Sequence, residues 1–193
     1  MRQRVPRAVW LIAGLVAALL VIPAAASANS FPGNGDSTVA DNDLHTYCYT
    51  SGFTTDTSVA SYAMSVLEST TDMEVLFPTS PATCAYEETD VWWWEIDHPA
   101  GTRGIRDCRD PNPGVVCIAS DVELDFPELD DGPNDTSDDD WEDRRKTAVH
   151  EVGHSIGLGH DTISTMRQGE IPDTSLTWRR YSGHDITHIN DEY

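Results

Sequence analysis

The chain has 193 residues, of which 33 are acidic and 12 are basic, and its formal net charge at pH 7 is −21. A surface this acidic repels nucleic acid and anionic membranes, so neither is expected as a stable partner, and we expect a monomer. The length suits one domain and is short for two.

The first 28 residues have the pattern of a secretory signal peptide. Three arginines precede an uncharged apolar run over residues 9–22, and residues 26–28 (Ala-Ser-Ala) are small, as a signal peptidase requires. A membrane anchor is the alternative, but the run is shorter than the ~20 residues that a spanning helix needs. Cleavage after Ala28 would change the net charge from −21 to −24, because the segment holds three basic residues and no acid. We therefore expect a secreted, extracellular protein.

The four cysteines, Cys48, Cys84, Cys108 and Cys117, predict two disulfides, because their number is even and the chain is exported. A four-cysteine zinc site is the alternative, but no close Cys-x-x-Cys pair is present. Three pairings are possible. The sequential pairing, Cys48–Cys84 with Cys108–Cys117, closes the shorter loops and is the one we favour; the sequence leaves the others open.

The first part of the exported chain is polar, and we interpret residues 29–43 as a flexible N-terminus or a short pro-segment. The folded domain would then span residues 44–193. Within it, residues 45–49 and 74–77 are predicted to be strands. Apolar residues at helical spacing predict an amphipathic helix over residues 57–69.

The segment "TDVWWWEID", residues 89–97, is aromatic and predicts a strand. Alternate side chains of a strand face opposite ways, so Trp93 lies on one side and Trp92 and Trp94 on the other. A tryptophan triplet could form a ligand platform. We favour the simpler interpretation, in which one side packs beneath a helix.

The middle of the chain is rich in turn residues and acids. Residues 97–114 hold many glycines and prolines and are expected to form a long loop, after which residues 115–126 resume strand character. Residues 130–140, "DDGPNDTSDDD", are expected to form an acidic loop. Such a loop either binds Ca²⁺ or is simply solvated, and it lacks the register of a helix–loop–helix calcium site.

The segment "TAVHEVGHSIGLGHD", residues 147–161, carries the chemistry. A helix is predicted over residues 141–158, and in a helix His150 and His154 project from the same face, one turn apart. A catalytic zinc ion takes three protein ligands and keeps an open position. The third ligand would be His160, returned to the ion by a sharp turn.

Glycines make that turn possible. Gly157 can adopt the positive φ that reverses the chain after the helix, and Gly159 eases the same bend. Glu151 lies one step round the helix from His150, where it cannot ligate the same ion but can reach a water beside it. These residues predict a catalytic zinc site with Glu151 as its general base.

The pattern H-E-x-x-H-x-x-G-x-x-H, here ending at His160, resembles the signature of the metzincin zinc endopeptidases. Their methionine turn is matched by Met166 in "STMRQG". The lead-in to the motif and the tryptophan strand look most like the matrixin family. The resemblance implies an α+β, zincin-like fold: a twisted mixed sheet, an active-site helix, and a small irregular C-terminal part. It further implies one catalytic Zn²⁺, protein or peptide substrates lying along the sheet edge, and peptide-bond hydrolysis.

Several features depart from that family. The matrixin cysteine-switch sequence is missing, so a latency mechanism is not carried over. Gln168 stands two residues after Met166, where astacins have a tyrosine ligand. Asp161 follows the third histidine. Matrixins usually have serine at this position, whereas an aspartate there is similar to adamalysins. We do not transfer the accessory metal sites of matrixins to this chain.

A second histidine pair, His184 and His188, lies in "GHDITHIN". No third ligand follows it, and we interpret the segment as a solvated or packed C-terminal helix. Tyr181 is a candidate hydrogen-bond donor that the sequence does not place. The alternatives to an enzyme are a secreted zinc-binding or adhesion module, which would have no use for Glu151, and a disulfide-bonded domain whose histidines only sense pH.

Overall fold

The protein is described by a computed structural model that covers residues 31, 38–77, 84, 89–110, 114–131 and 140–193. The expected signal peptide and most of the acidic loop lie outside these residues. Within them, no helix is long and apolar enough to cross a membrane. The strands are β1 (Val39–Ala40), β2 (Leu44–Tyr49), β3 (Glu74–Leu76), β4 (Val91–Glu95), β5 (Gly104–Cys108), β6 (Val116–Cys117) and β7 (Ser120–Leu124). The helices are α1 (Thr57–Thr70), α2 (Phe126–Asp131), α3 (Asp140–Ser155), the 3₁₀ helix η1 (Leu176–Arg179) and α4 (Gly183–Glu192).

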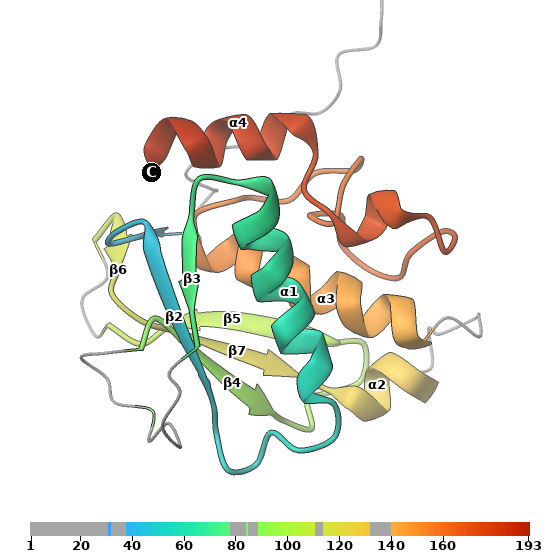
Figure 1. The fold of residues 1–193 in the computed structure, drawn as a ribbon. Helices are drawn as coiled ribbons and strands as arrows, with labels where there is room; N and C mark the ends of the chain where they lie inside the picture. Colours follow the sequence, from blue (N-terminus) through green and yellow to red (C-terminus); the bar gives the residue numbers. More distant parts are fainter. Residues whose placement is uncertain (1–30, 32–37, 78–83, 85–88, 111–113, 132–139) are drawn as a thin grey trace, which may run out of the picture.

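Five strands form a mixed sheet in the order β3-β2-β4-β7-β5 (Figure 1). The first four are parallel to one another, and β5 is antiparallel to β7 at the edge. Strands β1 and β6 form a separate parallel pair. The prediction of an α+β fold with a mixed sheet is confirmed.

One face of the sheet carries the core. The ring of Trp93 is fully buried and contacts Phe53 at a centroid distance of 5.8 Å. Trp92 and Trp94 lie on the opposite face, half-buried and stacked on each other. One side of the tryptophan strand therefore packs into the core, as the alternation predicted.

Helices α1 and α3 pack against each other beside the sheet (Figure 1). The side chain of Asp56 caps α1 by accepting a hydrogen bond from the backbone N–H of Ser58. The apolar face of α1, including Val59, Ala63 and Leu67, is completely buried. The helix predicted over residues 57–69 is thus confirmed, and it holds α3 in place from one side.

The expected long loop over residues 97–114 is wrong, because β5 lies inside it. "GIRDC" is not rich in β-branched or aromatic residues, and its strand structure comes from backbone pairing with β7, from Gly104↔Leu124 to Cys108↔Ser120. The expected strand over 115–126 is also divided into β6 and β7. Helix α2 begins directly afterwards, because the Asp125 carboxylate accepts a hydrogen bond from the N–H of Glu128.

The folded part begins before residue 44. Val39 and Ala40 are 5% and 6% exposed and pair with β6, so their burial removes them from the expected flexible segment. The N–H of Ala40 donates to the hydroxyl of Tyr193 at 2.7 Å. The same hydroxyl donates to the backbone carbonyl of Ile156, the residue directly after α3.

Both predicted disulfides are present in the favoured pairing, Cys48–Cys84 and Cys108–Cys117. The second bridge joins the end of the edge strand β5 to β6. It therefore holds the strand nearest to α3 at one end.

Candidate metal centre

The three predicted histidines come together. The Nε2 atom of His154 lies 3.1 Å from Nε2 of His150 and 3.1 Å from Nε2 of His160. All three nitrogens lie within 4.8 Å of one another, so the group could hold a metal ion. Two nitrogens bound tetrahedrally at ~2.05 Å from a zinc ion are ~3.3 Å apart. The observed separation is close to that value.

A glycine turn brings the third histidine to the other two. Gly157 has φ +103°. The Leu158 N–H donates to the Gly153 carbonyl at 2.9 Å and the Gly157 N–H donates to the His154 carbonyl at 3.3 Å. This is the Schellman arrangement that ends helices at a glycine. It reverses the chain directly after α3, as the sequence predicted, so His160 returns to the helix face.

The other ring nitrogens determine how the histidines are protonated. His150 Nδ1 is 2.8 Å from the Thr165 carbonyl, and His154 Nδ1 is 2.7 Å from the Leu158 carbonyl. A carbonyl only accepts, so each Nδ1 carries the hydrogen, and each neutral ring presents a lone pair at Nε2. The lone pairs of His150 and His154 then face each other at 3.1 Å. A shared cation resolves this repulsion, and such orientation of the second nitrogen is typical of metal-bound histidines.

Burial keeps these rings neutral. Desolvation lowers the pKa of His150 well below its usual value and that of His154 to about 4. The pKa of His160 is also lowered by burial, and the nearby charge of Lys146 contributes. A neutral imidazole is the form that binds a metal, so the site requires no deprotonation near neutral pH.

Met166 packs closely against α3 at Gly153. It is fully buried, and a Cβ placed on Gly153 would collide with its sulfur. The Asp161 N–H donates to the Met166 carbonyl at 3.0 Å, which closes the turn that follows the third histidine. Tyr181 also lies against Gly153, and its hydroxyl donates to the Val149 carbonyl at 3.1 Å. Tyr181 therefore packs against the same part of α3 as Met166.

Glu151 is buried between α3 and the edge strand. Its Oε1 lies 3.1 Å from where a Cβ on Gly104 would be, so the side chain approaches β5 where a glycine leaves room. Burial raises the pKa of Glu151 to about 8, while the positive charges of Lys146 and Arg106 lower it. A cation held by the histidines would add to that lowering and favour the carboxylate.

Two buried basic residues near the site were not identified from the sequence. Lys146 Nζ donates to the Gly169 carbonyl at 2.9 Å, and burial lowers its pKa to about 8. Arg106 on β5 donates to the Ser120 hydroxyl, and burial lowers its pKa to about 10. Lys146 lies one turn before His150, which is a spacing signal, but nothing in the sequence indicates that either side chain is buried.

The edge strand β5 borders the site. The Asp125 N–H donates to the Arg103 carbonyl and the Arg109 N–H donates to the Ala119 carbonyl. In an antiparallel pair the direction alternates along the strand, so the peptide groups of Gly104 and Cys108 point away from β7. This edge is where an extended chain could add to the sheet.

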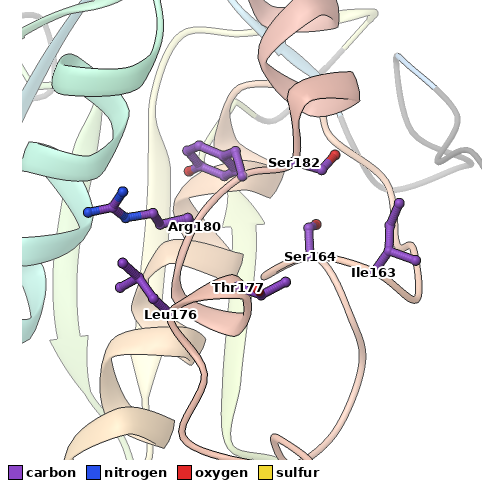
Figure 2. A pocket seen from close by; sticks show the side chains of 7 residues that line it. Ile163, Ser164, Leu176, Thr177, Arg180 and Ser182 are labelled. Carbon is purple, nitrogen blue, oxygen red and sulfur yellow. The ribbon is translucent and has the colours of Figure 1, made fainter.

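A pocket of about 340 Å³ lies beside Ile163 and Ser164, two residues that precede Met166 in the chain (Figure 2). It is formed where residues 163–164 meet residues 176–182, and none of the three histidines lines it. Ser164, at its wall, donates to the Asp161 carboxylate at 2.7 Å. The pocket is thus a feature of the C-terminal part, and its lining residues do not include the proposed metal ligands.

The second histidine pair does not join the centre. His184 and His188 lie on α4, which begins and ends close to the predicted segment. The calcium hypothesis concerns residues that mostly lie outside the described part.

Comparison of the chain with models of known protein families finds no match. Comparison with curated proteins finds no similar sequence. The family resemblance therefore rests on the residues of the motif and on their arrangement.

Proposed function

We propose that this protein is a secreted zinc-dependent endopeptidase of the metzincin type, most like the matrixins. The observation that carries the proposal is the convergence of three neutral imidazoles on one point beside a buried glutamate. His150, His154 and His160 are the proposed ligands and Glu151 is the proposed general base. The buried methionine turn and the mixed sheet with an edge strand support the family assignment.

The donor set fits zinc. Imidazole nitrogens suit Zn²⁺, Cu²⁺ and Ni²⁺ rather than the hard cations, and three histidines with an open fourth position are typical of catalytic zinc. The separation of the Nε2 atoms agrees with such a fit. When bound, zinc supplies a Lewis acid that polarises the scissile carbonyl and lowers the pKa of water.

Glu151 moves the proton. As a carboxylate it accepts a proton from the attacking water, and as an acid it then delivers that proton to the departing amine. Glu151 lies one step round α3 from His150, so it is next to the proposed ligands but does not point at the same ion. Burial between α3 and Gly104 restricts its rotation, so the carboxylate is held towards the edge strand.

Strand β5 orients the substrate. An extended peptide would pair with the outward peptide groups of Gly104 and Cys108 on β5, the strand that packs against α3 and whose Gly104 lies next to Glu151. Backbone pairing binds a peptide irrespective of its sequence, so protein or peptide substrates with an unstructured segment are proposed.

The test is the substitution Glu151→Gln, which keeps the shape of the side chain and removes the base. We expect peptide hydrolysis to fall by about 10²–10⁴ at unchanged zinc content. Cleavage of unfolded casein by the zinc-loaded variants measures this. Glu142→Gln, a half-buried residue in the first turn of the same helix, is the matched control and should retain full activity.

Two outcomes would contradict the proposal. Full activity in Glu151→Gln would refute the assigned base. A wild-type protein that binds zinc at the three histidines and cleaves none of a wide set of unfolded proteins and peptides would favour the zinc-binding or adhesion module instead.

A further inference from the structure

The exposed face of α4 presents two histidines in a metal-binding geometry. His184 Nε2 and His188 Nε2 are 3.1 Å apart, and their ring centroids are 4.3 Å apart. The pair on α3 has the same nitrogen separation of 3.1 Å and a centroid distance of 4.6 Å. The two pairs are therefore nearly the same arrangement on two helices.

We propose that His184 and His188 form a second, weaker binding site for a divalent transition-metal ion. Two nitrogens held at ~2.05 Å from one ion are ~2.9 Å apart at a right angle and ~3.3 Å apart at a tetrahedral angle. The observed 3.1 Å lies between these values. An ion can thus bridge the rings without rearrangement of the helix, and water completes its coordination.

The pair is held in place before an ion arrives. Ser182 and Asp185 form a capping box at the start of α4. At its other end the Asp72 N–H donates to the Asn190 side chain, and the Tyr193 hydroxyl reaches the Ile156 carbonyl. The ring of Phe31 stacks on His188 with an interplanar angle of 8°. A preorganised pair loses little entropy on binding, which raises the affinity that two ligands can reach.

The chemistry selects the ion. Imidazole favours Cu²⁺, Ni²⁺ and Zn²⁺ over Mg²⁺ and Ca²⁺, and affinity for a nitrogen site follows the order in which Cu²⁺ binds most tightly. The net charge of −21 raises the local concentration of any cation. General attraction to the acidic surface does not distinguish these ions from Mg²⁺ and Ca²⁺, whereas binding by imidazole does, so the ion preference identifies binding at the histidine pair.

The sequence offered no third ligand for this pair, and the described residues supply none within reach. With two protein ligands, the site should be weaker than the three-histidine centre. Zinc bound there would be lost on dialysis, whereas zinc at the centre would remain.

The experiment is a calorimetric titration with ZnCl₂ of the full chain that already holds its tightly bound zinc. We expect one further saturable binding event below about 1 mM ion. His184→Ala and His188→Ala should each weaken it at least about tenfold, because each removes one of two ligands. Thr187→Ala changes an exposed residue between them and is the matched control, which should bind as the wild type does.

MgCl₂ should produce no such event. The absence of a second event in the wild type, an event that survives both histidine substitutions, or an equal response to Mg²⁺ would overturn the proposal. The inference does not depend on the proposed enzyme activity. The same titration on the His154→Ala background, where the centre is disrupted, should still show the weaker event and its loss in His184→Ala.

Discussion

Two helices of this protein carry histidines four residues apart, and their surroundings differ. On α3 His150 is buried and His154 is half-buried, one ring nitrogen of each is engaged by a backbone carbonyl, and a third histidine returns to the same point. On α4 His184 is exposed and His188 is half-buried, with the ring of Phe31 against it.

The residue after the first histidine also differs. Glu151 follows His150 and lies buried beside β5, whereas Asp185 follows His184 and its carboxylate accepts the Ser182 N–H in the helix cap. The acid in the cap is engaged by the backbone, whereas the acid beside the strand is the one that we propose as the general base. The spacing of histidines therefore creates a pair, and the residues around it decide what that pair can do.

The largest effect is expected on retained zinc, when one histidine pair is disrupted and the other is left intact. His154→Ala removes a ligand of the three-histidine centre and should reduce the zinc retained after dialysis from one equivalent per chain to nearly none. His188→Ala removes the corresponding residue of α4 and should leave the retained zinc unchanged. Elemental analysis of the dialysed proteins measures both. Zinc loss in His188→Ala alone would place the tight site on α4.

The next effect concerns His45, the buried histidine that joins β2 to α3. The Ser155 hydroxyl donates to the Val152 carbonyl and therefore accepts from Nε2–H of His45 at 3.0 Å. Burial lowers the pKa of His45 to about 4, and the charge of Arg106 contributes. The unfolded chain takes up a proton here below pH 6.5, whereas the folded chain does so only near pH 4. The contribution of His45 to the free energy of unfolding is therefore fully present above pH 6.5 and is lost as the pH falls towards 4. The loss is at most about 3 kcal/mol.

His45→Gln should flatten this part of the pH profile, because glutamine does not titrate. Urea unfolding of both proteins between pH 7 and 4, with zinc chelated throughout, compares the slopes. Equal slopes would show that other groups produce the acid sensitivity.

A smaller effect tests how the third ligand reaches the centre. Gly157→Ala forces a side chain into positive φ and brings its Cβ to 3.0 Å from Val39 Cγ1, so we expect a loss of about 1–2 kcal/mol and weaker zinc binding. Gly183→Ala at the start of α4 is the matched control. No atom lies within 4 Å of its added Cβ and its φ is not positive, so stability should be nearly unchanged. Thermal unfolding with and without chelator measures the two variants.

The smallest effect is expected at the surface. His184 is exposed, so His184→Ala should change the free energy of unfolding by no more than about 0.5 kcal/mol in the absence of added metal. Chemical denaturation determines this value. A loss of several kcal/mol would mean that the pair supports the fold of α4 and would make its metal-binding variants unsuitable for comparison.

The part of the site that follows from local spacing was predictable. His150, His154 and Gly157 lie within one helix and its terminating turn, where geometry depends on sequence separation alone. The helix over residues 57–69 was predictable for the same reason. The disulfide pairing was favoured by loop length and was confirmed.

What could not be predicted depends on distant pairing. Strand β5 forms because β7 provides its partners, and its own residues resemble a loop. Lys146 and Arg106 are buried because α3 packs against β5, and this packing cannot be predicted from a local sequence pattern. The hydrogen bond that orients His150 is accepted by the backbone carbonyl of Thr165. Every residue has such a carbonyl, so the identity of the side chain does not reveal it.

The compactness of the centre along the chain affects when it can form during folding. Its three histidines and both carbonyls that orient them lie within residues 150–165. The sheet instead joins β2 to β4 through Tyr47 and Val91, which are 44 residues apart. Closing the shorter loop costs about 1 kcal/mol less chain entropy. A cation can therefore capture the helix and its turn before the parallel strands have found their partners, and so act as a template for the folding of the remainder.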